Sequence, residues 1–321
     1  MQHILITGGI GYIGGRIASY LKEKAPDSDV FLTTRDKNRT LPSWTDKFTV
    51  LQMNLLDEDS ITNCLDKRDI DIIIHLAALN EIDSIKDPAF ALAVNTGGTL
   101  KLLNAAIMHK VKRFIYFSTF HVYGETTVSV ITEETPTKPF HPYAITHRAA
   151  EDFVTFFNRY HNMQTLIFRL SNGYGYPMDK DINRWTLVFN DLCRQAVTFG
   201  RIVLKSSGKQ HRDFISLHDV ARAVYRFLFA TSDIWGDGLY NLGGSCSMSI
   251  LEVANKISEV YKTKYKKNTL EIKVGQDDCG ARTSKPFQFS IKKIANTGFA
   301  LQGDIISEIE KTFNVCEEFI K

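Results

Sequence analysis

A glycine-rich turn that directly follows a short apolar segment near the N-terminus constrains the fold more than any other feature of the sequence. Ile4–Thr7 has the pattern of a buried strand, and three glycines spaced three residues apart follow before a helical pattern begins. Such glycines allow a tight turn, a close approach of the backbone to a pyrophosphate and close helix packing. The helix N-terminus then offers N–H groups to the phosphates. The predicted dinucleotide contacts are Gly8, Gly11, Tyr12, Ile13 and Gly14.

The first half of the chain alternates between short apolar segments and helical patterns. The apolar segments show no clean polar alternation, which is typical of parallel strands that are covered by helices on both faces. Strand alternating with helix implies right-handed crossovers, and therefore an α/β fold with a doubly wound parallel Rossmann sheet. The predicted strands are Ile4–Thr7, Val30–Thr34, Phe48–Leu51, Ile70–His75, Phe114–Ser118 and Thr165–Leu170. The predicted helices are Gly14–Lys24, Ser60–Leu65, Ala89–His109 and Tyr143–Tyr160.

The alternation stops after Leu170, which predicts a smaller C-terminal α/β substrate lobe. We expect a dinucleotide-binding domain over residues 1–171 and a second lobe over 172–321, with part of the chain returning to the main sheet. The predicted helices of this half are Asn183–Phe199, Val220–Thr231, Ile250–Tyr261 and Asp304–Glu318. Its predicted strands are Ile202–Lys205, Phe214–Leu217, Leu239–Leu242 and Leu270–Val274.

Charge and cysteine content exclude several classes of protein. The 39 basic and 36 acidic residues are spread along the chain, whereas nucleic-acid and membrane-surface proteins concentrate basic residues in a patch. The five cysteines form no CxxC pair, so we predict neither a disulfide framework nor a metal site. No apolar run approaches the roughly 20 residues of a membrane span. The N-terminus lacks the features of a signal peptide. We therefore expect a soluble, cytoplasmic protein.

The end of the second predicted strand bears on the choice of nicotinamide cofactor. In this fold an acidic residue about 20 positions beyond the glycines holds the ribose 2′-hydroxyl, whereas an arginine accommodates a 2′-phosphate. Thr34 is followed here by Arg35 and Asp36. A strand that ends at Thr34 favours Arg35 and NADP, and a strand two residues longer favours Asp36 and NAD. The apolar run of this strand favours the earlier end, and therefore NADP.

A series of short motifs in a fixed order resembles the extended short-chain dehydrogenase/reductases, in the branch of nucleotide-sugar epimerases, dehydratases and ketoreductases. The resemblance covers nearly the whole chain. Besides the glycine turn it rests on His75-Leu76-Ala77-Ala78, Asn95, Ser118-Thr119, Val122-Tyr123-Gly124, Tyr143, Glu151, Arg169-Leu170, Asn172, Tyr174-Gly175, Arg212-Asp213-Phe214 and Tyr240-Asn241-Leu242-Gly243. The resemblance implies that Ala77 and Asn95 join the cofactor contacts. It also implies a homodimer formed through the helices Ala89–His109 and Tyr143–Tyr160.

The resemblance implies that Tyr143 is the acid–base residue and that Thr119 hydrogen-bonds the same substrate oxygen. Hydride then moves between nicotinamide and a sugar carbon while a proton moves on or off the phenol. The chain departs from the family four residues later, where His147 replaces a lysine. Positions i and i+4 share a helix face, so His147 points where the lysine would. With a reference pKa near 6.5, histidine supplies the lysine's positive charge only partly at neutral pH.

His121 lies two residues after Thr119, where related enzymes that move a carbon-bound proton carry an acid or base. It is predicted to act as a general base, to hydrogen-bond a sugar hydroxyl or to stabilise the loop. Phe120 replaces the aspartic acid of the 4,6-dehydratases, so their acid pair is absent.

The substrate contacts are predicted in both halves of the chain. By resemblance, Asn172, Arg212 and Arg282 contact a diphosphate, which an arginine fork can bind in a bidentate way. Asn80 is placed to contact the sugar.

These features predict an NADP-preferring oxidoreductase that reduces a keto group of a nucleotide-activated sugar. An epimerase with retained NAD is the alternative within the same family. A non-catalytic dinucleotide sensor or scaffold is the alternative from another class.

Overall fold

The computed structural model describes residues 2–36, 38–66, 68–125, 128–161, 163–230, 232–275 and 286–320 of the 321-residue chain. The chain forms two compact units. Unit 1 comprises Met1–Thr127, Glu133–Leu170 and Val224–Asn241, and unit 2 comprises Val128–Thr132, Ser171–Ala223 and Leu242–Lys321. Among the described residues, no helix combines the length and apolar character needed to cross a bilayer.

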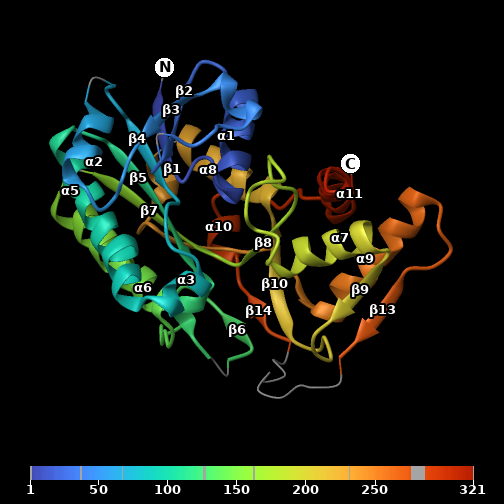
Figure 1. Cartoon of the computed structure of the whole chain (residues 1–321). Coiled ribbons are helices and arrows are strands. Elements are labelled where there is room, and N and C mark those ends of the chain that lie inside the picture. Colours follow the sequence, from blue (N-terminus) through green and yellow to red (C-terminus); the bar gives the residue numbers. More distant parts are fainter. Residues whose placement is uncertain are drawn as a thin grey trace. The chain divides into compact units, whose positions relative to one another are not determined.

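Unit 1 is built on a seven-stranded sheet with the strand order β11-β7-β5-β4-β1-β2-β3 (Figure 1). The pairings from β3 to β7 are all parallel. The order reverses between β1 and β4, the switch point at which doubly wound folds bind dinucleotides. This confirms the predicted fold class. The strands are β1 (His3–Thr7), β2 (Asp29–Thr34), β3 (Thr49–Gln52), β4 (Ile72–His75), β5 (Arg113–Thr119), β7 (Gln164–Leu170) and β11 (Leu239–Leu242).

Helices cover both faces of this sheet. Three helices that pack side by side cover one face: α2 (Glu58–Leu65), α5 (Thr99–Met108) and α6 (Pro142–Tyr160). Helix α1 (Tyr12–Lys24) packs on the opposite face (Figure 1). Local chemistry sets where two of these helices begin. Asp57 accepts a hydrogen bond from Ser60 N at the start of α2, and Pro142 occupies the first turn of α6, where its missing N–H costs nothing.

The predicted helix Ala89–His109 is divided into three segments. They are α4 (Pro88–Ala91), a π-helical segment (Leu92–Gly98) and α5. The Thr99 hydroxyl donates to the Asn95 carbonyl at 2.5 Å within this stretch. A short helix that the sequence patterns did not predict, α3 (Glu81–Lys86), precedes it and is capped by Asn80. π-helical turns such as the one at Leu92–Gly98 occur frequently at functional sites.

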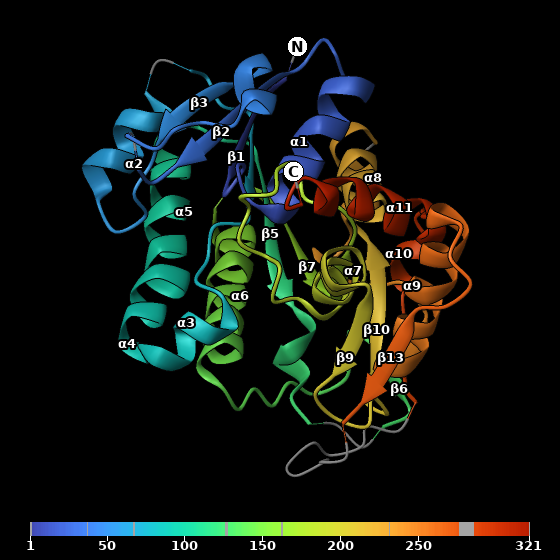
Figure 2. The same ribbon diagram turned by 45° about the vertical axis from the view of Figure 1, so that its right-hand side comes forward.

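In its described residues, unit 2 contains three small sheets and three longer helices, and some of these elements are labelled in Figure 2. The helices pack against one another around an apolar core that includes Phe189, Ile257 and Phe313. They are α7 (Val188–Phe199), α9 (Ile250–Tyr265) and α11 (Ile305–Glu317). The sheets are β12-β10-β8, β13-β9 and β14-β6. Their strands are β6 (Val130–Ile131), β8 (Asn172–Tyr174), β9 (Arg201–Leu204), β10 (His211–Ser216), β12 (Ser247–Ser249), β13 (Glu271–Val274) and β14 (Gln288–Phe289).

The chain passes from unit 2 to unit 1 within α8 (Leu217–Phe229) and returns to unit 2 at the end of β11. The remaining short helices are η1 (Ser43–Lys47), η3 (Phe120–Tyr123), η4 (Ser232–Trp235) and α10 (Lys292–Ala295).

Candidate active site

The glycine turn has the shape of a phosphate cradle. Gly8 adopts φ +68°, and its carbonyl accepts a hydrogen bond from Gly11 N at 2.9 Å. A Cβ on Gly14 would collide with the Gly8 carbonyl oxygen, so only glycine fits there. Gly11 is the N-cap of α1 and supplies no side-chain cap. A helix start without a side-chain cap is a common place for an anion to bind.

A buried chain of hydrogen bonds fixes the adjoining end of β4. The Thr99 hydroxyl donates to a carbonyl, so it accepts from His75 Nε2 at 2.9 Å. His75 Nδ1 then accepts from the Thr7 hydroxyl at 2.6 Å, and Thr7 Oγ1 accepts from Ala77 N at 3.3 Å. Burial lowers the pKa of His75 to about 3, which keeps the ring neutral. This series of hydrogen bonds holds Ala77 against the glycine turn. The two segments are so close that a Cβ on Gly8 would lie 3.1 Å from Ala77 N.

Asn95 has a positioning role in the structure. Its side chain is buried, with Oδ1 accepting from Leu79 N at 2.8 Å and Nδ2 donating to Thr146 Oγ1 at 3.0 Å. Asn95 thus joins the segment after β4 to α6. Both polar atoms of its side chain have a protein partner, which fixes the orientation of the amide.

Strand β2 ends at Thr34, and Arg35 is exposed directly after it. The next residue, Asp36, uses its side chain locally, since Oδ1 accepts from Asn38 N at 2.9 Å. The strand therefore ends at Thr34, the end that favours Arg35 as the contact to a 2′-phosphate.

Tyr143 is half-buried in the first turn of α6, among three histidine rings. Its ring centroid lies 4.5 Å from that of His147, 6.2 Å from that of His141 and 6.5 Å from that of His121. Thr119, at the end of β5, accepts a hydrogen bond from His121 N at 3.2 Å. His121 thus connects the predicted threonine and tyrosine.

His147 is fully enclosed, and Tyr116 is its partner. The Tyr116 hydroxyl lies 2.7 Å from His147 Nδ1. Burial, with smaller contributions from the charges of His121 and His141, lowers the pKa of His147 to about 3. The expectation of a partly charged imidazole is therefore corrected, because burial keeps the ring neutral at pH 7 and no acidic partner lies beside it among the described residues. The other nitrogen, Nε2, is buried and meets no hydrogen-bonding group in the described part of the chain.

A second polar group lies near Tyr143. His121 Nε2 and Glu81 Oε1 are 2.8 Å apart, and the His121 ring meets the His141 ring edge-on at 5.4 Å. Burial is the main cause that lowers the pKa of His141.

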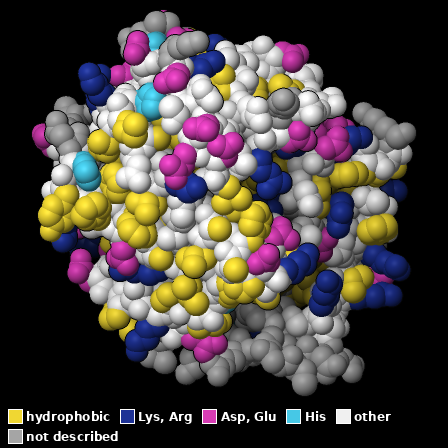
Figure 3. Space-filling view, turned by 60° about the vertical axis from the view of Figure 1, so that its left-hand side comes forward, with side chains coloured by type: hydrophobic (Ala, Val, Ile, Leu, Met, Phe, Trp, Pro, Cys, Tyr) yellow, Lys and Arg dark blue, Asp and Glu magenta, His cyan; other side chains and the backbone are white. Residues whose placement is uncertain are grey.

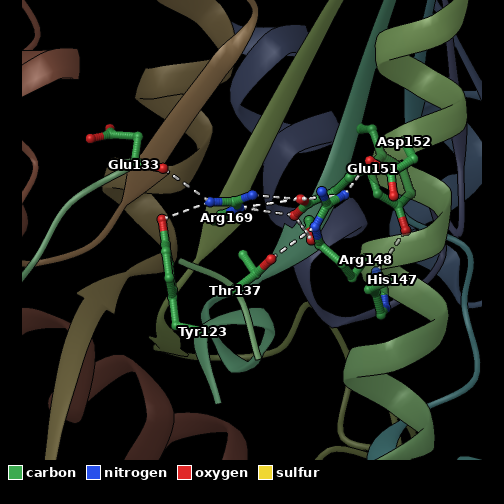
Figure 4. A network of polar contacts seen from close by, with 10 residues as sticks. Tyr123, Glu133, Thr137, His147, Arg148, Glu151, Asp152 and Arg169 are labelled. Carbon is green, nitrogen blue, oxygen red and sulfur yellow. Dashed lines mark hydrogen bonds and ion pairs between the residues drawn. The ribbon is translucent and has the colours of Figure 1, made fainter. Parts of the chain in front are cut away.

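Several motif residues form a buried network (Figure 4). Arg169 Nη2 and Glu151 Oε2 lie 2.7 Å apart, and both side chains are almost completely buried. Glu151 also accepts from Ser118 Oγ at 2.5 Å, and Arg169 Nη1 donates to the Tyr123 hydroxyl at 3.0 Å. Tyr123 in turn donates to Asn241 Oδ1 at 2.6 Å. Burial opposes the charge on Arg169, but the Glu151 contact outweighs it and raises the arginine's pKa.

The predicted substrate residues have different surroundings. Asn80 caps α3, with Oδ1 accepting from Asp83 N at 3.0 Å and Nδ2 donating to Asp83 Oδ2 at 2.7 Å. In unit 2, Asn172 Nδ2 donates to the Asp213 carbonyl at 2.9 Å, and Arg212 is exposed on β10. Arg282 lies outside the described residues.

Comparison with known proteins decides the family. The NAD dependent epimerase/dehydratase family matches residues 4–243. The chain belongs to this family. It is 31% identical over 273 residues to a dTDP-D-glucose 4,6-dehydratase of Mus musculus, covering 81% of this chain and 73% of the relative. The recognised resemblance is thereby confirmed.

Solved structures show the same fold. The UDP-glucose 4-epimerase of Thermotoga maritima, solved with UDP-glucose, superposes with a TM-score of 0.84 at 20% identity, and all of both chains is covered. RMD from Pseudomonas aeruginosa, complexed with NADPH, superposes with a TM-score of 0.79 at 22% identity, covering 99% of this chain and 100% of the other. The family model shows an enzyme family that uses a nicotinamide dinucleotide, and the solved structures show the fold. They do not establish the expected keto-sugar reduction.

The residues present fit the dinucleotide that the epimerase/dehydratase family uses. A Cβ at position 14 would fill the cradle of the glycine turn, and the first turn of α1 is uncapped by a side chain. His147 Nε2 is a buried polar atom that a bound hydroxyl could satisfy. Glycine backbone, α1 and His147 are therefore the groups that would hold the dinucleotide.

Sequence reasoning missed Tyr116 and Glu81. Tyr116 lies within an apolar strand, where an aromatic side chain is ordinary, and Glu81 lies in a helix that was not predicted. Their partners are 31 and 40 positions away, and no local pattern connects them.

Proposed function

We propose that this protein epimerises a ring carbon of a nucleotide-activated sugar through a transient keto sugar. The observation that supports this proposal is the group of side chains around Tyr143. The phenol is half-buried at the start of α6, in contact with His147, where the family has its acid–base tyrosine. After Thr119 come Phe120 and His121, which lack the carboxylate pair of the dehydratases. Oxidation and re-reduction of one carbon requires the tyrosine but not that pair.

Tyr143 moves the proton in both half-reactions. When bound, the nicotinamide supplies a hydride acceptor that later returns the hydride. In the first half-reaction the phenolate oxygen of Tyr143 takes the proton of the sugar hydroxyl while the C–H bond at that carbon breaks. In the second half-reaction the same oxygen returns the proton to the new alkoxide. Thr119 holds the reacting oxygen, and His147 supports Tyr143 by packing and position.

Unit 2 supplies the diphosphate contacts in this proposal. Arg212 follows His211 on β10, and the carbonyl of the next residue, Asp213, holds Asn172 Nδ2. The Asp213 carboxylate accepts from Gly244 N at 2.8 Å and from Cys246 N at 3.0 Å, so it orders the adjoining turn. Arg212→Ala should therefore weaken the binding of free nucleoside diphosphates as well as nucleotide sugars in calorimetry. Unchanged affinity for the free diphosphate would remove this contact from the proposal.

Assays of the purified protein with UDP-glucose and with dTDP-glucose, with no cofactor added, test the proposed epimerase activity. NMR of the products should show inversion at one carbon by the protein as purified. Tyr143→Phe should lower the rate by about 10²–10⁴-fold, the usual contribution of a general acid or base. Tyr160→Phe, on the exposed end of the same helix, is the matched control and should retain the rate. Equal rates for the two variants would refute the role of Tyr143.

Net reduction of a keto sugar by NADPH is the second candidate, favoured by Arg35. The exposed arginine directly follows β2, and Asp36 is used in its own turn. The neutral His147 also favours Tyr143 as a proton donor, which reduction needs.

Arg35→Ala separates the two candidates. If Arg35 binds a 2′-phosphate, the variant should weaken NADPH binding by about 1.5–3 kcal/mol, the range for a charged hydrogen bond, and leave NADH binding nearly unchanged. Arg39→Ala is the control, because Arg39 is an exposed arginine four positions further along the chain. Fluorescence titration with both cofactors measures the effect. Equal losses for NADPH and NADH would favour the epimerase with NAD.

A further inference from the structure

We propose that Glu81, His121 and His141 bind a divalent transition-metal ion of the zinc class. The three residues each offer one ligand atom, and these atoms all lie within 4.8 Å of one another. Within the part of the chain that the structure describes, no other group of three or more histidine, cysteine, aspartate or glutamate residues meets this condition. Two imidazoles and one carboxylate form a ligand set that zinc uses in proteins, with a further position open.

The spacing of the ligand atoms suits such an ion after small side-chain movements. Zinc bonds of about 2.0–2.2 Å at tetrahedral angles put ligand atoms about 3.3 Å apart. His121 Nε2 and Glu81 Oε1 are 2.8 Å apart, slightly closer than this, and no pair of the three ligand atoms exceeds 4.8 Å. An ion therefore requires the His121–Glu81 pair to open slightly.

Each ligand comes from a separate segment that is held by its own contacts. Glu81 begins α3, and Asn80 caps that helix. His121 is held by the hydrogen bond from its backbone N–H to Thr119 Oγ1 at 3.2 Å. His141 is the N-cap of α6 and precedes Pro142. Such anchoring limits the movement of the ligands and favours a defined site.

One existing contact opposes the ion. His141 Nδ1 accepts from Ala144 N at 3.4 Å, and this capping contact would be lost if Nδ1 bound the metal or gained a proton. The contact is long, so its loss costs little beside a metal–nitrogen bond.

The three-residue set differs from an ordinary ion pair. His109 and Asp66 form such a pair, with Nε2 and Oδ1 3.0 Å apart, but no third ligand joins them among the described residues. His109 therefore provides a matched control for a histidine that faces one carboxylate.

Calorimetry with zinc chloride on metal-stripped protein without a purification tag tests the proposal. The wild type should bind one ion per chain. His121→Ala and His141→Ala should each weaken that binding by at least about 10-fold, since loss of a mere outer-shell contact costs about 10–100-fold. Glu81→Gln should weaken it as well, and His109→Ala should not. Cobalt absorption spectra check the coordination, and thermal unfolding without metal checks that each variant folds.

Two results would overturn the site. One is the absence of saturable zinc binding by the wild type. The other is an equal loss of affinity in His109→Ala and His121→Ala. Substrate and nicotinamide are absent from these titrations, so the outcome is independent of the proposed epimerase.

Discussion

His147 is the residue at which this chain departs from its family, and its surroundings determine what the departure does. A lysine in this place would stabilise the phenolate of Tyr143 by its charge. The enclosed His147, with its pKa lowered to about 3 by burial, provides no such charge at neutral pH. The Tyr116 hydroxyl contacts Nδ1. Tyr143 is therefore expected to keep its proton more firmly than in relatives with the lysine.

His147→Lys should restore part of the missing charge. We expect faster alcohol oxidation near neutral pH and an oxidation profile displaced to lower pH, because a nearby cation makes the phenol a better base. Reduction should change little or fall. Initial rates in both directions across pH measure this, with Arg148→Lys on the same helix as control. Superimposable pH–rate curves for wild type and variant would show that residue 147 does not act on Tyr143.

At the scale of elements, the Glu151–Arg169 pair ties α6 to β7. Glu151→Gln leaves Arg169 buried beside a neutral amide, and breaking a buried pair in this way costs about 3–5 kcal/mol of unfolding free energy. Asp152→Asn is the control, because Asp152 is exposed and its contact with Arg148 is a surface ion pair worth about 0–1 kcal/mol. Urea unfolding measures both. Similar losses for the two variants would mean that the buried network does not stabilise unit 1.

The exposed face of the same helices suggests how copies of the chain associate. Large apolar side chains are exposed on α6 and the π-helix–α5 stretch, and Figure 3 shows hydrophobic side chains gathered on this face. They are Leu92, Met108, Ile145, Phe153, Phe156 and Tyr160. Exposed apolar patches mark association surfaces. We propose a homodimer through this face.

Phe156→Glu should convert that dimer to a monomer, because a buried unpaired charge would destabilise the interface. Light scattering at micromolar concentration measures the mass. Phe199→Glu, on α7 of unit 2, changes a more exposed apolar residue elsewhere and should leave the dimer intact. A wild-type chain that is already monomeric would remove the proposal.

At the scale of the whole molecule, two buried neutral histidines make stability depend on pH. Burial lowers the pKa values of His75 and His147 to about 3, against about 6.5 in the unfolded chain. The unfolded chain therefore binds more protons below pH 6.5. The stabilisation is present above that pH and is lost as the pH falls towards 3, by about 1.4 kcal/mol per pH unit for each histidine.

His147→Gln tests this dependence. Between pH 6 and 4 the free energy of unfolding of the variant should change less steeply with pH, by about 1.4 kcal/mol per pH unit. The reason is that one of the two buried histidines that take up a proton on unfolding is gone. His161→Gln, at an exposed position after α6, is the control. Urea unfolding at a series of pH values gives the slopes. Parallel curves for wild type and His147→Gln would show that His147 is not the group that titrates.

The sequence alone determined the doubly wound sheet, its strand boundaries to within about two residues and the glycine turn. These features are local, since apolar periodicity, helix caps and the φ of Gly8 depend on residues that are close along the chain. The end of β2 at Thr34 was predictable for the same reason.

Only the tertiary structure decided what the individual polar residues do. Motif residues such as Ser118 and Glu151 belong to a buried network, and Asn80 caps a helix that the patterns did not predict. Burial made His147 neutral, and the packing of α3, η3 and α6 brought Glu81, His121 and His141 together. Protonation and ligand geometry depend on distances and solvent exposure between segments that lie far apart in the chain. Spacing along the sequence does not encode those quantities.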